Sequence, residues 1–112
     1  MMNVTHSGNT LSIDGKQFVM PYLIQDAFVA GALAVVLLDP DANLGKASQY
    51  RNLVGVAQDG RTVWEAELPT DRRSDVYWRI VTRSPLVASS FSSYDCEIDP
   101  VTGRLVKSTF YK

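Results

Sequence analysis

Short turns built on a hydrogen-bond acceptor and a glycine or proline divide this chain into pieces of strand length. Glycine reaches the positive φ that tight hairpin turns need, and Asp, Asn, Ser and Thr side chains accept hydrogen bonds inside such turns. Turns about 8–12 residues apart are typical of β-sandwiches, barrels and propeller blades. The turn signals are Ser7-Gly8-Asn9, Asp14-Gly15, Asp59-Gly60, Ser84-Pro85 and Asp99-Pro100-Val101-Thr102-Gly103.

The composition agrees with a strand-rich fold. The chain has nine Asp but only three Glu, and Val, Ile and Thr together occupy 24 of its 112 positions. Asp favours turns and caps over helix interiors, whereas β-branched residues suit a pleated surface. The sequence therefore predicts a single all-β domain over residues 1–112. We expect an antiparallel meander of eight to ten short strands in two propeller-blade-like or sandwiched sheets.

One segment does not follow this pattern. Gln25–Leu38 is apolar on every side and long enough for a helix, and Asp26 could act as its N-cap. Gly31 and the Val35-Val36 pair instead favour a turn followed by a buried strand. We predict a strand for the second half, and residues 26–31 fit either a short helix or a strand.

Strand registers follow from the turns. A two-residue hairpin loop at Asp59-Gly60 places Gly55 opposite Trp64, where a glycine leaves room for the indole ring. If the following strand returns alongside, Glu65 lies opposite Arg79, a favourable cross-strand pair. The expected core face is then formed by Leu53, Trp64, Ala66, Leu68, Val76, Trp78 and Ile80.

Three segments repeat one local plan of acceptor, glycine and basic residue before an extended strand. Their glycines, Gly15, Gly60 and Gly103, lie 45 and 43 residues apart, a spacing typical of propeller blades. The segment Leu53–Leu68 resembles a blade edge of the PQQ-type β-propeller repeats, with an aliphatic strand, an Asp-Gly turn and a tryptophan. Cys96–Val106 is similar to the Asp-Pro-x-Thr-Gly version of that turn.

The resemblance departs from the repeat at one position and covers about half of the chain. Lys107 stands where the second copy would carry tryptophan. A closed propeller needs at least four blades of about 40 residues, which exceeds the length of this chain. The layout also resembles small uncharacterised bacterial all-β proteins that end in an Asp-Pro-x-Thr-Gly segment. Neither resemblance implies an activity.

Charge and cysteine content narrow the class of protein. Eleven basic and twelve acidic residues give a net charge of −1, which disfavours a nucleic-acid partner because such proteins need a basic surface. No apolar run approaches the roughly 18 residues of a membrane span, and no signal peptide is recognisable. The single cysteine, Cys96, fits a reducing compartment. We expect a bacterial cytoplasmic protein without a membrane partner.

Candidate catalytic and metal sites are weak in this sequence, and no cofactor is predicted. The loop Asp39–Gly45 spaces oxygen side chains as calcium loops do, but it lacks the glycine and the bidentate Glu of the EF-hand, so we expect a solvated loop. His6 and Cys96 could form a nucleophile–base pair, yet the alternation around Cys96 points it into a core. The carboxylates Asp95, Glu97 and Asp99 alternate along one strand and fit a solvent face or a docking surface for a basic partner.

The densest group of basic and aromatic residues is the best candidate contact surface, since Tyr and Arg are enriched at protein interfaces. Together with two acidic neighbours, the predicted protein-contact patch consists of Arg72, Arg73, Tyr77, Arg79, Arg83, Glu65 and Glu67.

The function expected from the sequence is that of a non-enzymatic protein-binding module, comparable to an immunity or accessory protein. One alternative is a small-ligand or enzyme domain with an aromatic pocket. A second alternative is a structural homo-oligomer, such as a homodimer, in which a valine strip and an open sheet edge pair across a two-fold axis. The aromatic pocket would be lined by Tyr22, Trp64, Trp78 and Phe91, and the strip consists of Val54, Val56, Val63 and Val81.

Overall fold

The computed structural model describes residues 2–43 and 49–111 of the chain. Within these residues the fold is all-β: eleven strands form three antiparallel sheets, and a 3₁₀ turn (η1, Pro40–Asn43) is the one helical element. The all-β antiparallel prediction is confirmed, with three sheets in place of the expected two. The strands are β1 (Val4–Ser7), β2 (Thr10–Ile13), β3 (Lys16–Val19), β4 (Ile24–Ala30), β5 (Leu33–Leu38), β6 (Leu53–Val56), β7 (Thr62–Glu65), β8 (Tyr77–Thr82), β9 (Val87–Ser90), β10 (Tyr94–Ile98) and β11 (Leu105–Phe110).

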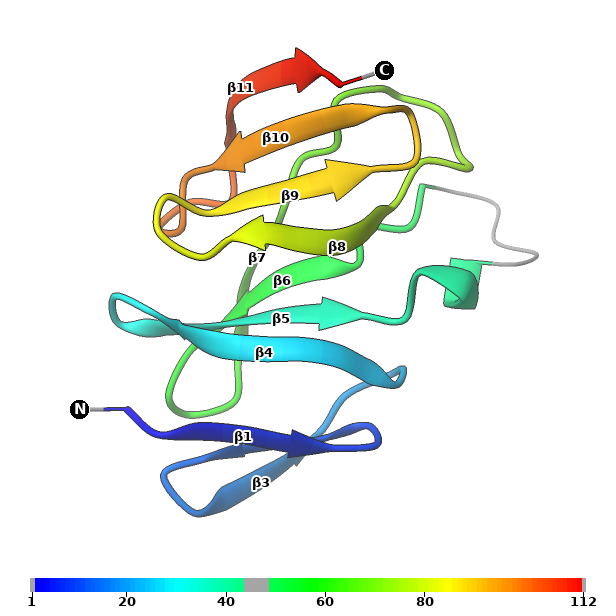
Figure 1. Cartoon of the computed structure of the whole chain (residues 1–112). Helices are drawn as coiled ribbons and strands as arrows, with labels where there is room; N and C mark the ends of the chain where they lie inside the picture. The colour runs from blue at the N-terminus through cyan, green and yellow to red at the C-terminus, as the bar shows by residue number, and fades with distance from the viewer. Residues whose placement is uncertain (1, 44–48, 112) are drawn as a thin grey trace.

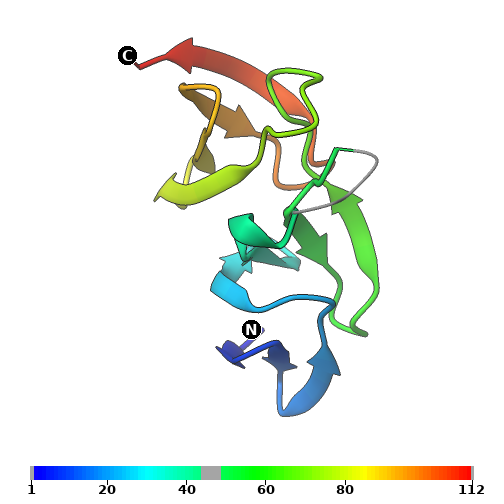
Figure 2. The ribbon, with the colours of Figure 1, turned by 90° about the vertical axis from the view of Figure 1, so that its right-hand side faces the viewer.

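The sheets follow one another along the molecule in chain order (Figure 1). The first sheet is β1-β2-β3, the middle sheet is β4-β5-β6-β7, and the last sheet is ordered β11-β10-β9-β8. The two chain ends therefore lie at opposite ends of the molecule, as the turned view in Figure 2 also shows. One apolar core lies on each side of the middle sheet.

Strand β5 explains how the middle sheet holds both cores. Its odd-numbered residues Val35 and Leu37 pack in the core shared with the last sheet, whereas Ala34 and Val36 pack in the core shared with the first sheet. A strand covered on both faces has no need of polar alternation, so its sequence is a continuous apolar run. The same burial explains why the segment looked apolar on every side.

The helix alternative for residues 26–31 is wrong. Residues Ile24–Ala30 form β4, which pairs with β5 through a turn in which Gly31 has a φ of 60°. Hairpin pairing satisfies the backbone of both strands and lets β5 bury both of its faces, which an isolated helical turn could not do.

The predicted registers are partly correct. Gly55 does lie opposite Trp64, but the neighbouring pair is shifted by a bulge, and Val56 faces Thr62. The expected pairing of β7 with β8 is wrong, because β7 ends the middle sheet and β8 belongs to the last one. Glu65 therefore has Val54 as its strand partner instead of Arg79.

Two aromatic rings pack directly against glycines, and each reaches a turn of the neighbouring sheet. The Trp64 indole lies between Gly55 and Gly103, and a Cβ added to Gly103 would approach the ring to 2.7 Å. Its Nε1 donates a hydrogen bond to the Pro100 carbonyl at 3.0 Å. The ring of Phe18 covers Gly60 in the same manner. Each of these rings ties its own sheet to the turn of the next sheet.

A buried amide joins the middle sheet to the last one. The Asn52 side chain donates to the carbonyls of Leu38 and Tyr77 at 2.9 and 2.6 Å and accepts from the Tyr77 N–H at 3.0 Å. Asn52 is completely buried, so these bonds satisfy all but one of its hydrogen-bonding positions in a place that water does not reach. The amide thus fixes where β8 begins relative to β5 and β6.

Candidate functional site

The residues of the predicted protein-contact patch come from different elements of the fold. Arg72 and Arg73 belong to the segment between β7 and β8, Arg79 lies on β8 and Arg83 just after it, and Glu65 lies on β7, in a different sheet.

Tyr77 is a correction to the patch, because it lies fully inside the core shared by the middle and last sheets. Its hydroxyl donates to the carbonyl of Glu67, and burial raises the pKa of the phenol. The cause of the error is a bulge in β8: Tyr77 faces Ser90 and Arg79 faces Ser89, so Trp78 is an extra residue. One inserted residue reverses the alternation of a strand and turns Tyr77 inward.

Several charged members of the patch have structural partners. The guanidinium of Arg83 lies 4.7 Å from the centre of the Phe28 ring and 3.5 Å from the carboxylate of Asp26, which ties β8 to β4. Glu67 accepts a hydrogen bond from the Leu105 N–H at 2.9 Å and so holds the start of β11. The guanidinium of Arg79 lies 4.9 Å from the centre of the Trp78 ring, and the Arg79 side chain remains exposed on the surface of β8.

The aromatic pocket expected as an alternative is not assembled. Trp64 is buried between glycines, whereas Phe91 is 59% exposed at the turn between β9 and β10. Tyr22 packs edge-to-face against Tyr50, with ring centres 5.3 Å apart. Trp64 lies on β7 and Tyr22 before β4, whereas Trp78 and Phe91 belong to the last sheet, so the four aromatic residues do not line one pocket.

The candidate catalytic pair is also separated. His6 lies on β1 and Cys96 on β10, at opposite ends of the stack of sheets. The thiol is fully buried, and burial raises the pKa of Cys96 to about 11. Since the thiolate is the nucleophilic form, this environment disfavours nucleophilic chemistry at Cys96.

No group of three or more His, Cys, Asp or Glu residues in 2–43 and 49–111 is arranged to hold a metal ion. Leu44 and Gly45 of the predicted Asp39–Gly45 loop lie outside the described residues. At the start of this loop the Asp39 carboxylate already accepts a hydrogen bond from the Asp41 N–H at 3.0 Å.

The carboxylate row along β10 is partly engaged within its own sheet. Asp95 accepts a hydrogen bond from the Ser89 hydroxyl, and Glu97 lies opposite Lys107 on β11. Asp99 accepts from the Val101 N–H at 2.8 Å and shapes the turn before β11. These partners account for the residue types without an acid–base function.

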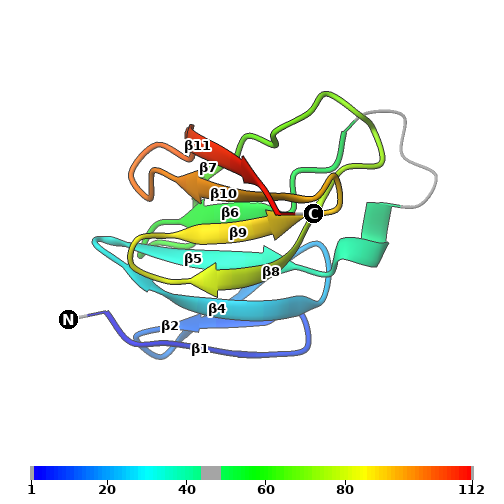
Figure 3. The same ribbon diagram turned by 45° about the horizontal axis from the view of Figure 1, so that its top comes forward.

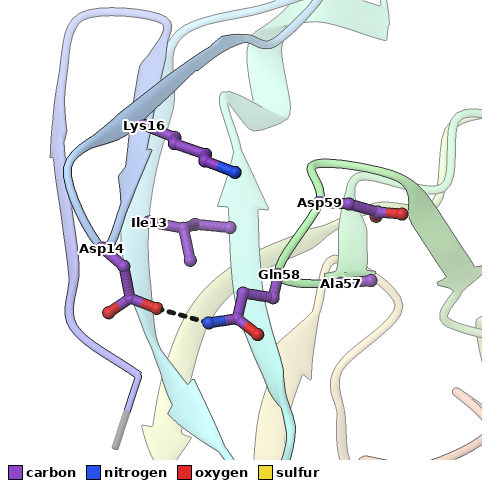
Figure 4. A pocket seen from close by; sticks show the side chains of 6 residues that line it. All are labelled: Ile13, Asp14, Lys16, Ala57, Gln58 and Asp59. Carbon is purple, nitrogen blue, oxygen red and sulfur yellow. Dashed lines mark hydrogen bonds between the residues drawn. The ribbon is translucent and has the colours of Figure 1, made fainter.

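A hollow of about 420 Å³ lies where the β2–β3 turn meets the β6–β7 turn (Figure 4). Asp14 accepts hydrogen bonds there from the Asn3 N–H at 2.8 Å and from the Gln58 side chain at 2.7 Å. These bonds hold the pKa of Asp14 below its usual range. The polar groups drawn together in this hollow thus serve as a brace between two turns.

The turn at Phe91 is the best-built exposed feature of the last sheet. Asp75 is 2% exposed, and its carboxylate accepts from the Thr70 hydroxyl at 2.7 Å and from the Ser92 hydroxyl at 3.0 Å and N–H at 3.2 Å. On the other side, the Tyr111 hydroxyl donates to the Ser90 carbonyl at 3.2 Å. The turn is therefore fixed from both sides while the Phe91 ring stays in solvent.

Beside this ring lies a hollow of about 220 Å³ that also includes the buried carboxylate of Asp75. We define the Phe91 surface as the remaining residues around it: Arg72, Ser74, Phe91 and Ser92. An exposed ring next to a guanidinium and hydroxyls offers apolar contact and hydrogen bonds together, a combination typical of protein interfaces.

Sequence reasoning identified Arg72 but missed Phe91, which lines the same hollow. Phe91 was grouped with the aromatic pocket, although its position among serines, in Ser89-Ser90-Phe91-Ser92-Ser93, is typical of an exposed turn. That pattern is the sequence signal that could have found it.

In the part of the chain that the structure describes, no helix has the length and apolar character to cross a membrane. The chain belongs to the DUF7957 family, a domain of unknown function, whose family model matches residues 1–110. No curated protein and no solved structure shows significant similarity to it.

Proposed function

We propose that this member of a domain family of unknown function is a non-enzymatic protein-binding module, with an accessory or immunity-like role, and that it holds its partner through the Phe91 surface. The observation that carries the proposal is a 59% exposed phenylalanine on a turn that buried hydrogen bonds hold in place. Phe91 lies beside Arg72, and phenylalanine and arginine are both enriched at protein interfaces.

The rigidity of this turn matters for affinity. Binding costs less when the contacting side chain is already ordered, because little further conformational entropy is lost. Asp75 orders the turn through Ser92, and the Phe91 N–H donates to the Val76 carbonyl at 3.0 Å. A phenylalanine held in this way supplies a large contact area, and Arg72 beside it favours a partner with a carboxylate near its anchoring residue.

The non-enzymatic part of the proposal is supported by the environment of Cys96. A buried thiol with a raised pKa is a poor nucleophile, and His6 lies on the far sheet. A free buried cysteine is also what we expect of a protein in a reducing cytoplasm, where we place this chain.

The test is affinity capture from cells that make the protein, with wild type and Phe91→Ser compared by quantitative mass spectrometry. We expect one protein to be retained in near-stoichiometric amount by wild type and lost with Phe91→Ser. Arg72→Glu should weaken the same interaction, since it reverses the charge beside the ring.

Val19→Ser is the matched control, because Val19 is also a strongly exposed apolar residue but lies on β3 at the other end of the molecule. It should retain the partner as wild type does. The proposal fails if wild type retains no protein specifically, or if Phe91→Ser and Val19→Ser retain the same set equally well.

A further inference from the structure

A hollow of about 430 Å³ borders the core shared by the first and middle sheets. We call it the tyrosine hollow, after Tyr22 and Tyr50, which line it. Its volume falls within the range of about 300–1,000 Å³ that small-molecule sites occupy. Met20, Leu38 and Val54 also line it, and all three are buried apolar residues of that core. The tyrosine hollow therefore has an apolar inner side, and it shares no residue with the Phe91 surface.

The two tyrosines give the hollow an aromatic side. Tyr22 and Tyr50 pack edge-to-face against each other. The Tyr50 hydroxyl donates to the Asp39 carbonyl at 3.2 Å, and burial raises the pKa of this phenol. Tyr22 is half-buried and so reaches both the core and the surface. Rings that are already held in place can receive an apolar group with little further loss of conformational entropy.

Strand β7 brings two polar side chains to the same hollow. It is an edge strand of the middle sheet (Figure 3). Glu65 lies opposite Val54 across the β6–β7 pair, and Thr62 lies opposite Val56. Residues directly opposite each other share one face of a sheet, so Thr62 and Glu65 lie on the face of the buried valines. Both polar residues are nevertheless exposed, so this face is apolar and closed on β6 but polar and open on β7.

Arg51 and Glu65 bring opposite charges to the hollow without neutralising each other. Both line it, and both are exposed. Within residues 2–43 and 49–111 the ion pair that forms is that of Arg83 with Asp26, so Arg51 and Glu65 are not paired with each other. The Arg51 Nε donates to the Gln49 side chain at 3.4 Å, a bond that does not use the two terminal nitrogens of the guanidinium. A ligand with a carboxylate and an ammonium group can form a charge-assisted hydrogen bond with each of the two side chains.

We propose that the tyrosine hollow binds a small zwitterion, namely an α-amino acid with an apolar or aromatic side chain. Arg51 pairs with the carboxylate of the ligand and Glu65 with its ammonium group, while the ligand side chain lies against Tyr22 and Tyr50. A ligand with one charge would cover the opposite-charge partner that it lacks, and a wholly apolar ligand would take both charges out of water without compensation. This site goes beyond the protein-binding role proposed above.

The test is isothermal titration calorimetry of the full chain with L-phenylalanine and L-leucine. Two analogues each lack one charge of L-phenylalanine: phenethylamine has no carboxylate, and 3-phenylpropionate has no ammonium group. We expect saturable binding of at least one of the two amino acids at one site per chain. Each analogue should bind about tenfold or more weakly than L-phenylalanine, because it loses a hydrogen bond between charged groups.

Two variants that remove one charge each should differ in their selectivity. Arg51→Gln should weaken amino-acid binding about tenfold without weakening phenethylamine, which has no carboxylate for Arg51 to bind. Glu65→Gln should weaken amino-acid binding by a similar factor without weakening 3-phenylpropionate. A purely structural effect of either variant would instead lower the affinity for all of these ligands together.

Thr62→Phe places a ring in the hollow and should abolish binding, while urea unfolding shows that the fold is retained. Arg104→Gln and Glu97→Gln are the matched controls, because they make the same changes on the last sheet and its turn. They should bind the amino acids as wild type does, and so should Phe91→Ser, which separates this site from the protein-binding proposal. The proposal is overturned if neither amino acid binds saturably, or if either analogue binds as tightly as L-phenylalanine.

Discussion

Three glycines allow the contribution of the Trp64 contact to be separated from backbone strain. Gly15 has a φ of 84° with nothing near its missing Cβ, so an alanine there meets strain alone. Gly55 has no left-handed φ, but its Cβ would overlap the Trp64 ring, so an alanine there meets the contact alone. Gly103 has a φ of 75° and also touches the ring, so an alanine there meets both.

The magnitudes follow from these differences. A left-handed conformation costs an L-residue about 1–2 kcal/mol, partly offset by about 0.4–1 kcal/mol because alanine restricts the unfolded chain. We therefore expect Gly15→Ala to destabilise the fold by about 1 kcal/mol or less. Overpacking costs about 1–3 kcal/mol, so Gly55→Ala should lose about 1–2 kcal/mol and Gly103→Ala about 2–4 kcal/mol.

Urea unfolding followed by far-UV circular dichroism gives the free energy of unfolding for each variant, and an unchanged m-value shows that the comparison is valid. A double-mutant cycle completes the design: in a Trp64→Leu background, Gly103→Ala should cost no more than Gly15→Ala does. Equal losses for Gly15→Ala and Gly103→Ala, or a neutral Gly55→Ala, would refute the view that the indole is clamped between strand β6 and the β10–β11 turn.

Three further predictions concern buried and ionised groups. Asn52→Ala leaves the buried backbone groups of Leu38 and Tyr77 without partners and should lower the free energy of unfolding by about 2–4 kcal/mol in urea; a loss below about 1 kcal/mol would contradict the bridging role. Cys96, whose thiol pKa is raised by burial, should not react with Ellman's reagent at about pH 8 until urea unfolds the chain, and rapid reaction of the native protein would show that the thiol is accessible. Asp14 has a lowered pKa when folded, so its ionised form stabilises the fold above about pH 4, and this contribution disappears as the pH falls through the folded pKa. The difference in urea midpoint between wild type and Asp14→Asn should shrink between about pH 6 and about pH 2, and a difference that is constant over this range would be inconsistent with that role.

The turns were predictable from the sequence because their chemistry is local. Gly15, Gly60 and Gly103 all have positive φ, and the side chains of Asp59 and Asp99 accept N–H bonds two residues on. A short-range pattern of this kind does not depend on the rest of the fold. The all-β class and the hairpins followed from it directly.

The face on which Tyr77 lies was harder to predict, because it depends on the phase of strand β8. The alternation Val76, Trp78, Ile80 suggested that Tyr77 points outward, yet the bulge at Trp78 turns Tyr77 into the core. The bulge in β8 is held by the neighbouring strand β9 and by the side chain of Asn52, which accepts from the Tyr77 N–H. Neither of these is part of the sequence of β8. Residues next to a bulge therefore cannot be assigned to a face from one strand alone.

Whether a strand lies inside a sheet or at its edge could be predicted in part from the sequence. The apolar run of β5 indicates burial on both faces, and the mixed run of β11 indicates an edge. These two strand sequences do not show that β7 and β8 belong to different sheets. A sheet that paired β7 with β8 would satisfy their backbone groups as well as the observed arrangement does. The turn at Gly103 receives Trp64 from β7, and this contact packs the last sheet face to face against the middle one.

The predicted valine strip is divided because its members lie on three strands of two sheets. Val54 and Val56 are covered by the first sheet, whereas Val63 and Val81 remain exposed.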